Sequence, residues 1–124
     1  MTNSPIRSYR DLEVWKEGMN LAEASYKITK SFPREEIYGM ISQIRRSAAS
    51  IPANIAEGYG REYRAEYIQF LRVAQGSLKE LETHLLLSAR VELTTVQAVS
   101  PILNQCDSVG RLLRALIRSL QSKN

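Results

Sequence analysis

The sequence is poor in the residues on which most catalytic and metal sites depend. It has one cysteine, Cys106, and one histidine, His84, among 124 residues. A single cysteine excludes an intramolecular disulfide and a cluster of thiolate ligands. A single histidine excludes paired-histidine zinc sites and the di-iron helical bundle, which needs a Glu-x-x-His motif on each of two helices. We therefore expect no metal, no cofactor and no enzymatic activity.

Long apolar runs are missing as well. No stretch approaches the roughly 18 apolar residues that a membrane span requires, and residues 1–7 lack the apolar core of a signal peptide. A lone cysteine is also typical of proteins from reducing compartments. These absences predict a cytoplasmic protein with no membrane-spanning segment.

What is present suits one packed domain spanning residues 1–124, with residues 1–8 and 122–124 expected to be flexible. Hydrophobic residues make up 44% and charged residues 24% of the chain, which is the balance of a globular protein and not of a disordered one. The net charge of +4 and the pI of about 9.4 are mildly basic. This charge permits an acidic partner such as nucleic acid without requiring one.

Four segments place apolar residues at alternating spacings of three and four, which is the pattern of helices packed lengthwise. The predicted core positions are Leu12, Trp15, Met19, Ala22 and Tyr26; Ile37, Ile41, Ile44, Ala48, Ile51 and Ile55; Tyr67, Leu71, Ala74, Leu78, Leu81 and Leu85; and Val99, Ile102, Cys106, Val109, Leu113, Leu116 and Leu120. The connections between these segments are short, so consecutive helices should be antiparallel neighbours. The sequence thus predicts an all-α, antiparallel up-and-down four-helix bundle, with Cys106 as a buried core thiol.

Residues that favour helix ends separate the four segments. Phe32 and Pro33 close the first helix, and Pro33 suits the first turn of the second. The Gly58-Tyr59-Gly60 stretch should end the second helix through the left-handed conformation that glycine adopts readily. Thr94 with Gln97 predicts a capping box at the start of the fourth.

Two prolines fall within helical patterns. Pro52 should kink the second helix and leave the Ala48 carbonyl without its helical partner, which Asn54 or Ser50 could replace. Pro101 either kinks a helix that begins near Thr95 or is itself the first helical residue. We favour the kink.

Some apolar residues lie off the predicted core positions, and two interpretations stay open. They could broaden the core face, or they could form a second face that is buried by self-association. These residues are Val14, Leu21, Ile28, Leu86, Leu87, Leu103 and Ile117.

The densest group of polar side chains lies on the second helix, and the charged residues Arg72, Glu80 and Glu82 lie on the third. Together they predict an inter-helix charge network that sets register and packing, an interpretation that we prefer to a ligand site. Its members are Arg45, Arg46, Ser50, Pro52, Asn54, Glu57, Arg72 and Glu80.

Arginines recur at helical spacing on the last helix, at Arg111, Arg114 and Arg118, and after Glu92 the only acidic residue is Asp107. Such a row could follow a phosphate backbone, or it could be a solvated face. Because no aromatic side chains accompany it, base-specific recognition of single strands is not expected. Arg61 and Arg64 are the next candidates for a nucleic-acid contact.

The chain closely resembles the bacterial four-helix-bundle family encoded within intervening sequences of 23S ribosomal RNA genes. The similarity is carried by residues 9–15, 32–39, 43–47, 50–58 and 70–82, and the most specific stretch is SIPANIAEG at residues 50–58. The resemblance implies an up-and-down bundle that assembles into a ring, a homopentamer, in the cytoplasm. Members are often labelled as a ribosomal protein, and the family has no catalytic residues to carry over.

A related accessory protein of diversity-generating retroelements forms a similar basic pentamer and binds nucleic acid. This resemblance favours RNA or DNA as a partner of the present chain. We therefore expect a non-enzymatic oligomeric bundle that binds RNA through basic helix faces. The alternative is a protein-interaction scaffold with no role in nucleic-acid binding.

Overall fold

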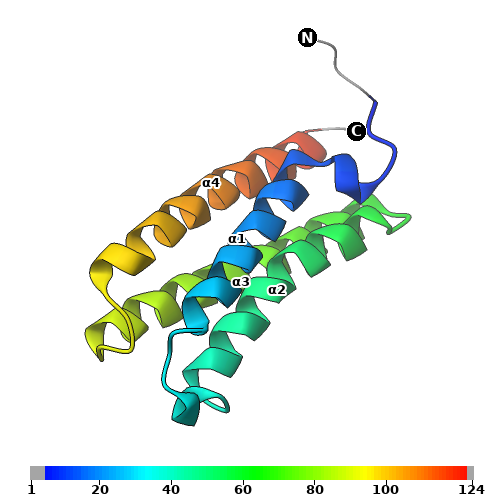
Figure 1. The fold of residues 1–124 in the computed structure, drawn as a ribbon. Coiled ribbons are helices and arrows are strands. Elements are labelled where there is room, and N and C mark those ends of the chain that lie inside the picture. Colours follow the sequence, from blue (N-terminus) through cyan, green and yellow to red (C-terminus); the bar gives the residue numbers. More distant parts are fainter. Residues whose placement is uncertain (1–4, 123–124) are drawn as a thin grey trace.

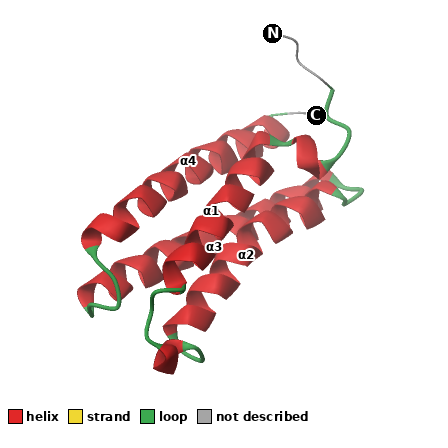
Figure 2. Ribbon diagram, viewed as in Figure 1, coloured by secondary structure: helices red, strands yellow, loops and turns green. Residues whose placement is uncertain are grey.

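The computed structural model describes residues 5–122, and within this range the regular elements are helices joined by loops and turns (Figures 1 and 2). The four α-helices are α1 (Glu13–Thr29), α2 (Met40–Tyr59), α3 (Arg64–Arg90) and α4 (Val96–Gln121). Two short 3₁₀ helices, η1 (Tyr9–Asp11) and η2 (Arg34–Glu36), precede α1 and α2. The described residues contain no strand, so the prediction of an all-α four-helix protein is confirmed.

Each helix packs against two others: α1 and α3 both contact α2 and α4. The contacts between helices run in antiparallel order. Thr29 at the end of α1 bonds Arg45 near the start of α2, whereas Gly18, earlier in α1, faces Pro52 in the second half of α2. In Figure 1 each helix likewise starts near the end of the preceding one and runs back alongside it.

Buried apolar side chains from all four helices form a single core. Its members are Val14, Leu21, Phe32, Ile41, Ile44, Ala48, Ile51, Ile55, Leu71, Ala74, Leu78, Leu81, Leu85, Val99, Ile102, Cys106, Val109, Leu113 and Ile117. The core positions predicted for α2 between residues 41 and 55 are all buried, and α3 and α4 follow their predicted patterns closely. Ile37 is an exception, because it is 52% exposed in the turn before α2.

The core face predicted for the first helix is only partly right, because Leu12, Trp15 and Ala22 are partly buried against the core whereas the other two positions are exposed. Met19 is 44% exposed and Tyr26 is 41% exposed, and α1 instead buries the face that carries Val14, Gly18, Leu21, Ser25 and Thr29. This face looks less apolar in the sequence because it includes a glycine and two hydroxyl residues. The Ser25 hydroxyl is buried at little cost because it donates to the Leu21 carbonyl at 2.9 Å.

Most of the apolar residues off the predicted core positions broaden the core face, as the first interpretation predicts. Val14, Leu21 and Ile117 belong to the core. Ile28 and Leu103 are partly buried against it. Leu86 and Leu87 remain exposed.

Two helix starts differ from the prediction. Helix α2 begins at Met40 and not at Pro33, because η2 forms first and Gly39 leaves the helical conformation at φ −114° and ψ −113°. Helix α4 is capped by Thr95 and not by Thr94: the Thr95 hydroxyl accepts from the Ala98 amide at 3.1 Å.

The predicted mechanism for ending α2 is also wrong. Gly60 follows the helix with φ −79° and ψ −2°, in the right-handed region that any residue adopts. Within residues 5–122 the residue with a positive φ is Glu92, at φ 66°, two residues after the end of α3.

Both internal prolines lie within continuous helices. Helix α4 starts at Val96, so Pro101 is not its first residue. In α2, the Asn54 amide group donates to the Ser50 carbonyl at 2.8 Å and to the Ser50 hydroxyl at 2.9 Å. The Asn54 side chain is therefore not the hydrogen-bond donor that was expected for the Ala48 carbonyl.

The chain before α1 is partly ordered by one carboxylate. Asp11 accepts hydrogen bonds from the backbone amides of Arg7 at 2.9 Å and Ser8 at 3.2 Å, and these bonds hold the pKa of Asp11 below its usual value. Residues 1–4 and 123–124, which belong to the segments expected to be flexible, lie outside the described residues. Within the described chain, no helix is long and apolar enough to span a membrane.

Helices α2 and α3 approach each other closely at Gly58. A Cβ atom at this position would lie 2.8 Å from the Phe70 Cβ and 3.1 Å from the Tyr67 ring. Since the Phe70 Cβ is fixed to its own helix, it cannot move without a shift of α3. Gly76 on α3 has open space where its Cβ would be.

Replacing each glycine with alanine should separate packing from helix propensity. Gly58→Ala should lower the free energy of unfolding by about 1–3 kcal/mol, because the added methyl group forces the two helices apart. Gly76→Ala should raise it by about 0.5–1 kcal/mol, because alanine is the better helix former in open space. Urea unfolding followed by circular dichroism measures both changes, and stabilisation by Gly58→Ala would contradict this packing.

Candidate nucleic-acid interface

Helix α4 turns an arginine face to the solvent. Arg111, Arg114 and Arg118 are exposed on the side of α4 that points away from its core residues, as their spacing predicts. Gly110 leaves room for Arg114 to lie along the helix, because a Cβ at Gly110 would be 3.3 Å from a guanidinium nitrogen. Asp107 is exposed on the same helix.

The first of the three arginines has acidic neighbours. A guanidinium nitrogen of Arg111 donates to the Ser108 hydroxyl at 3.3 Å, and Arg111 shares a hollow with Glu13 and Glu17 of α1. These two carboxylates offset part of its charge. Arg114 and Arg118 are therefore the stronger candidates on α4 for a phosphate contact.

Arg61 and Arg64 lie at the α2–α3 turn and line a hollow of about 320 Å³ together with Leu120 of α4. Leu120 is two residues beyond Arg118, so the fold brings the turn to the end of α4 that carries the arginines. We call Arg61, Arg64, Arg114 and Arg118 the basic end. Two segments that are far apart in the sequence thus contribute to one end of the bundle.

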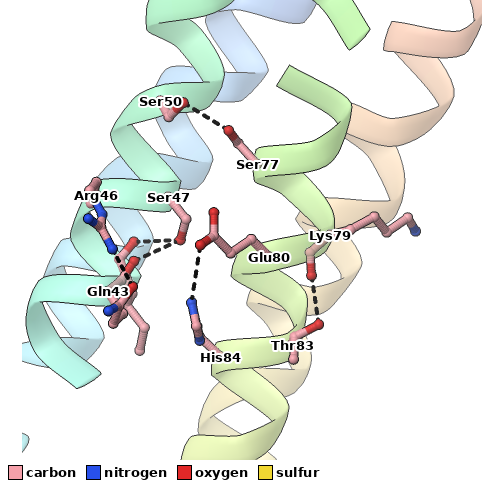
Figure 3. A network of polar contacts seen from close by, with 10 residues as sticks. Gln43, Arg46, Ser47, Ser50, Ser77, Lys79, Glu80, Thr83 and His84 are labelled. Atoms are coloured by element: carbon pink, nitrogen blue, oxygen red, sulfur yellow. Dashed lines mark hydrogen bonds and ion pairs between the residues drawn. The ribbon is translucent and has the colours of Figure 1, made fainter. Parts of the chain in front are cut away.

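The predicted inter-helix charge network does not form among the described residues. Glu57 pairs with Arg61 at 3.0 Å, one turn along the same segment, and Arg46 bonds Gln43 within α2. Glu80 lies 3.8 Å from His84 on α3 (Figure 3). The Glu57–Arg61 pair is exposed, and exposed ion pairs contribute little to stability.

Neutral hydroxyls and one stacked arginine connect the helices instead. The Ser50 and Ser77 hydroxyls are 2.8 Å apart and join α2 to α3 (Figure 3). Arg45 joins α2 to α1, because its Nε donates to the Thr29 hydroxyl at 2.9 Å and its guanidinium carbon lies 4.8 Å from the centre of the Tyr26 ring. Arg72 remains exposed on α3.

The lone cysteine is not accessible for chemistry. Cys106 is fully buried in the core, and burial, followed by the nearby carboxylates of Glu82 and Asp107, raises the pKa of its thiol to about 12. The Nε2 atom of His84 is buried without a hydrogen-bond partner. No group of three or more His, Cys, Asp or Glu side chains within residues 5–122 could hold a metal ion.

A second surface lies between α1 and α2. We call it the α1–α2 groove: it has a volume of about 360 Å³ and is lined by Tyr9, Trp15, Met19, Ala22, Ala49, Pro52, Ala53 and Ala56. Tyr9 and Trp15 form an edge-to-face pair with ring centres 5.3 Å apart. The side chains that α2 contributes to the lining of the groove are small. This groove contains much of the apolar face that the sequence pattern had assigned to the core.

Residues 10–115 match the family described as 23S rRNA-intervening sequence proteins. The chain belongs to this family. A crystal structure of a protein of unknown function from the S23 ribosomal protein family of Bacteroides thetaiotaomicron has a similar fold, with a TM-score of 0.75 and 30% sequence identity, over 84% of the present chain and 97% of the other. No curated protein sequence matches the chain. Neither the family description nor that of the Bacteroides protein names an enzymatic activity.

The environment of Cys106 in this family member predicts a protected thiol. Iodoacetamide at mildly alkaline pH should label the folded protein far more slowly than the urea-denatured protein, because burial disfavours the thiolate. Folding raises the pKa of the thiol and so favours its neutral form. The resulting contribution of Cys106 to the free energy of unfolding is fully present below pH 9.0 and is lost as the pH rises toward about 12. Mass spectrometry measures the labelling, and equal rates for the folded and denatured chains would contradict the assignment.

Proposed function

We propose that this 23S rRNA-intervening sequence protein is a non-enzymatic, cytoplasmic homo-oligomer that binds structured RNA through the phosphate backbone. The observation that carries the proposal is the meeting of Arg61 and Arg64 with the arginine-bearing end of α4 at one end of the bundle. The family description, which refers to 23S rRNA, favours RNA as the nucleic acid to test first.

The arginines that α4 contributes to the basic end are better suited to bind phosphate groups than the edges of bases. Guanidinium groups bind phosphates with paired hydrogen bonds and keep their charge at all physiological pH values. Such contacts release counterions and are therefore sensitive to salt. In a ring, each subunit would present the same arginines, and the combined contacts would bind more tightly than one subunit could.

The basic end can be tested with a pair of variants that change the net charge equally. Arg114→Ala with Arg118→Ala should weaken binding to a 23S rRNA fragment and reduce the slope of log K against log salt by up to about 0.9 for each phosphate group that is no longer neutralised. Arg34→Ala with Arg90→Ala, at the opposite end of the bundle, is the matched control and should have little effect. Mobility shifts across a salt series measure both, and equally weakened binding by the two variants would show that net charge alone matters.

The α1–α2 groove is the proposed contact between subunits. Monomeric proteins seldom expose large apolar patches, and the groove is lined by the exposed Met19 together with Ala49 and Ala53, which are also exposed. Small residues on a helix allow another helix to approach closely, so α2 could pack against a neighbouring copy here. A homopentameric ring is the assembly that the family resemblance implies.

A charge placed in the groove should prevent assembly without unfolding the subunit. Ala53→Glu buries a carboxylate only if subunits associate there, so this variant should sediment as a monomer with unchanged helical content. Ala115→Glu, at an exposed position of α4, is the control and should keep the assembly of the unmodified protein. Sedimentation velocity measures the difference, and an intact oligomer of the Ala53→Glu variant would exclude this groove as the subunit contact.

A protein-interaction scaffold is the second candidate function. It is supported by the exposed apolar side chains of Leu86, Leu87, Val91 and Val96 around the α3–α4 connection. Recovery of one protein at a stoichiometric ratio, with no nuclease-sensitive material, would favour the scaffold over RNA binding.

A further inference from the structure

The hollow at the α2–α3 turn differs chemically from the arginine face of α4. It is lined by Arg61, Glu62, Tyr63, Arg64, Tyr67 and Leu120, and we call it the turn pocket. It combines guanidinium groups with an aromatic ring that is open to solvent, because Tyr63 is 62% exposed. The sequence shows no aromatic residues within the arginine row of α4, and the fold supplies them from another segment.

Two side chains of the turn pocket, Arg61 and Tyr67, contact neighbouring residues that restrict their movement. Arg61 is positioned by the Phe70 ring, whose centre is 4.7 Å from the guanidinium carbon, and by an exposed ion pair with Glu57 at 3.0 Å, which also offsets part of its charge. Tyr67 is half-buried and makes a perpendicular contact with Tyr59, with ring centres 6.0 Å apart. Side chains that are ordered in advance lose little conformational entropy when a ligand binds.

Cations beside an exposed aromatic ring suit a nucleotide whose base is unpaired. Bases stack on aromatic rings with little dependence on sequence, and arginines attract the attached phosphate. Duplex RNA cannot use such a pocket, because its bases are already stacked on one another. The volume of about 320 Å³ is near the lower limit of about 300 Å³ for ligand pockets, and it suits one nucleotide better than a longer strand.

We infer that the turn pocket binds one unpaired nucleotide next to a helical segment of RNA, with its base stacked on Tyr63 and its phosphate facing Arg61 and Arg64. Glu62 on the pocket wall repels phosphate, so the phosphate lies on the arginine side. The inference rests on the proposed binding of RNA and specifies what part of the RNA is recognised. Arg114 and Arg118 contact the adjoining helix, and the turn pocket adds a preference for helices that end or bulge in an unpaired base.

Two RNA hairpins with the same stem test the inference, one blunt and one with a short single-stranded 3′ extension. Fluorescence anisotropy with the full-length protein should show about tenfold tighter binding of the extended hairpin. Tyr63→Ala should abolish this preference and leave the affinity for the blunt hairpin unchanged. Tyr63→Phe, which keeps the ring, should retain the preference.

Tyr38→Ala is the control for removal of an exposed tyrosine, because Tyr38 is 95% exposed in the α1–α2 connection, and it should leave the preference intact. Binding of both hairpins with equal affinity would overturn the inference about the turn pocket, while the proposed function would stand. Persistence of the preference in Tyr63→Ala would also overturn it. Failure of the unmodified protein to bind either hairpin would overturn the proposed function and this inference together.

Discussion

The close approach of α2 and α3 is the constraint on which the rest of the bundle depends. Gly58 allows the backbone of α2 to lie against Phe70, and farther along the same pair of helices Ser50 and Ser77 share a hydrogen bond at 2.8 Å. Small residues at both places let the two helices pack along most of their length. This packing fixes the short turn between them and so determines where Arg61 and Arg64 lie relative to α4.

Packing also determines which apolar residues remain at the surface. Helix α1 faces the core through Val14 and Leu21 together with a glycine and two hydroxyl residues. The glycine, Gly18, leaves space for Ile51 and Ile55 of α2. Two other large apolar residues of α1, Trp15 and Met19, border the α1–α2 groove. The same arrangement that completes the core thus creates the apolar surface that we assign to self-association.

Much of the fold could be predicted from the sequence, because regular apolar spacing reports burial directly where one face of a helix is clearly the more apolar. The apolar spacing identifies the core face of α2, α3 and α4. For α1 it does so only in part, because the buried face carries small and hydroxyl residues that do not stand out in the sequence, while a larger apolar residue, Met19, lies outside the core. The start of α2 could not be predicted from Pro33 alone, because Gly39 leaves the helical conformation between η2 and α2.

The candidate site was only partly predictable, for a similar reason. Helical spacing placed Arg111, Arg114 and Arg118 on one face of α4, but spacing within a helix carries no information about neighbouring helices. The acidic residues of α1 beside Arg111 and the position of the α2–α3 turn beside Leu120 depend on tertiary packing. Long charged side chains reach partners along their own helix more easily than on a neighbouring helix. Hydroxyl contacts and the stacked Arg45 therefore take the place of the predicted inter-helix charge network.

The central claim is that RNA contacts the basic end of an intact bundle. Ultraviolet cross-linking of the protein in its host cells, followed by nuclease digestion and mass spectrometry, identifies the peptides that carry nucleotides. The account predicts cross-linked peptides from residues 61–67 and 111–121. Cross-links confined to the α1–α2 groove, or protein that carries no RNA at all, would contradict it.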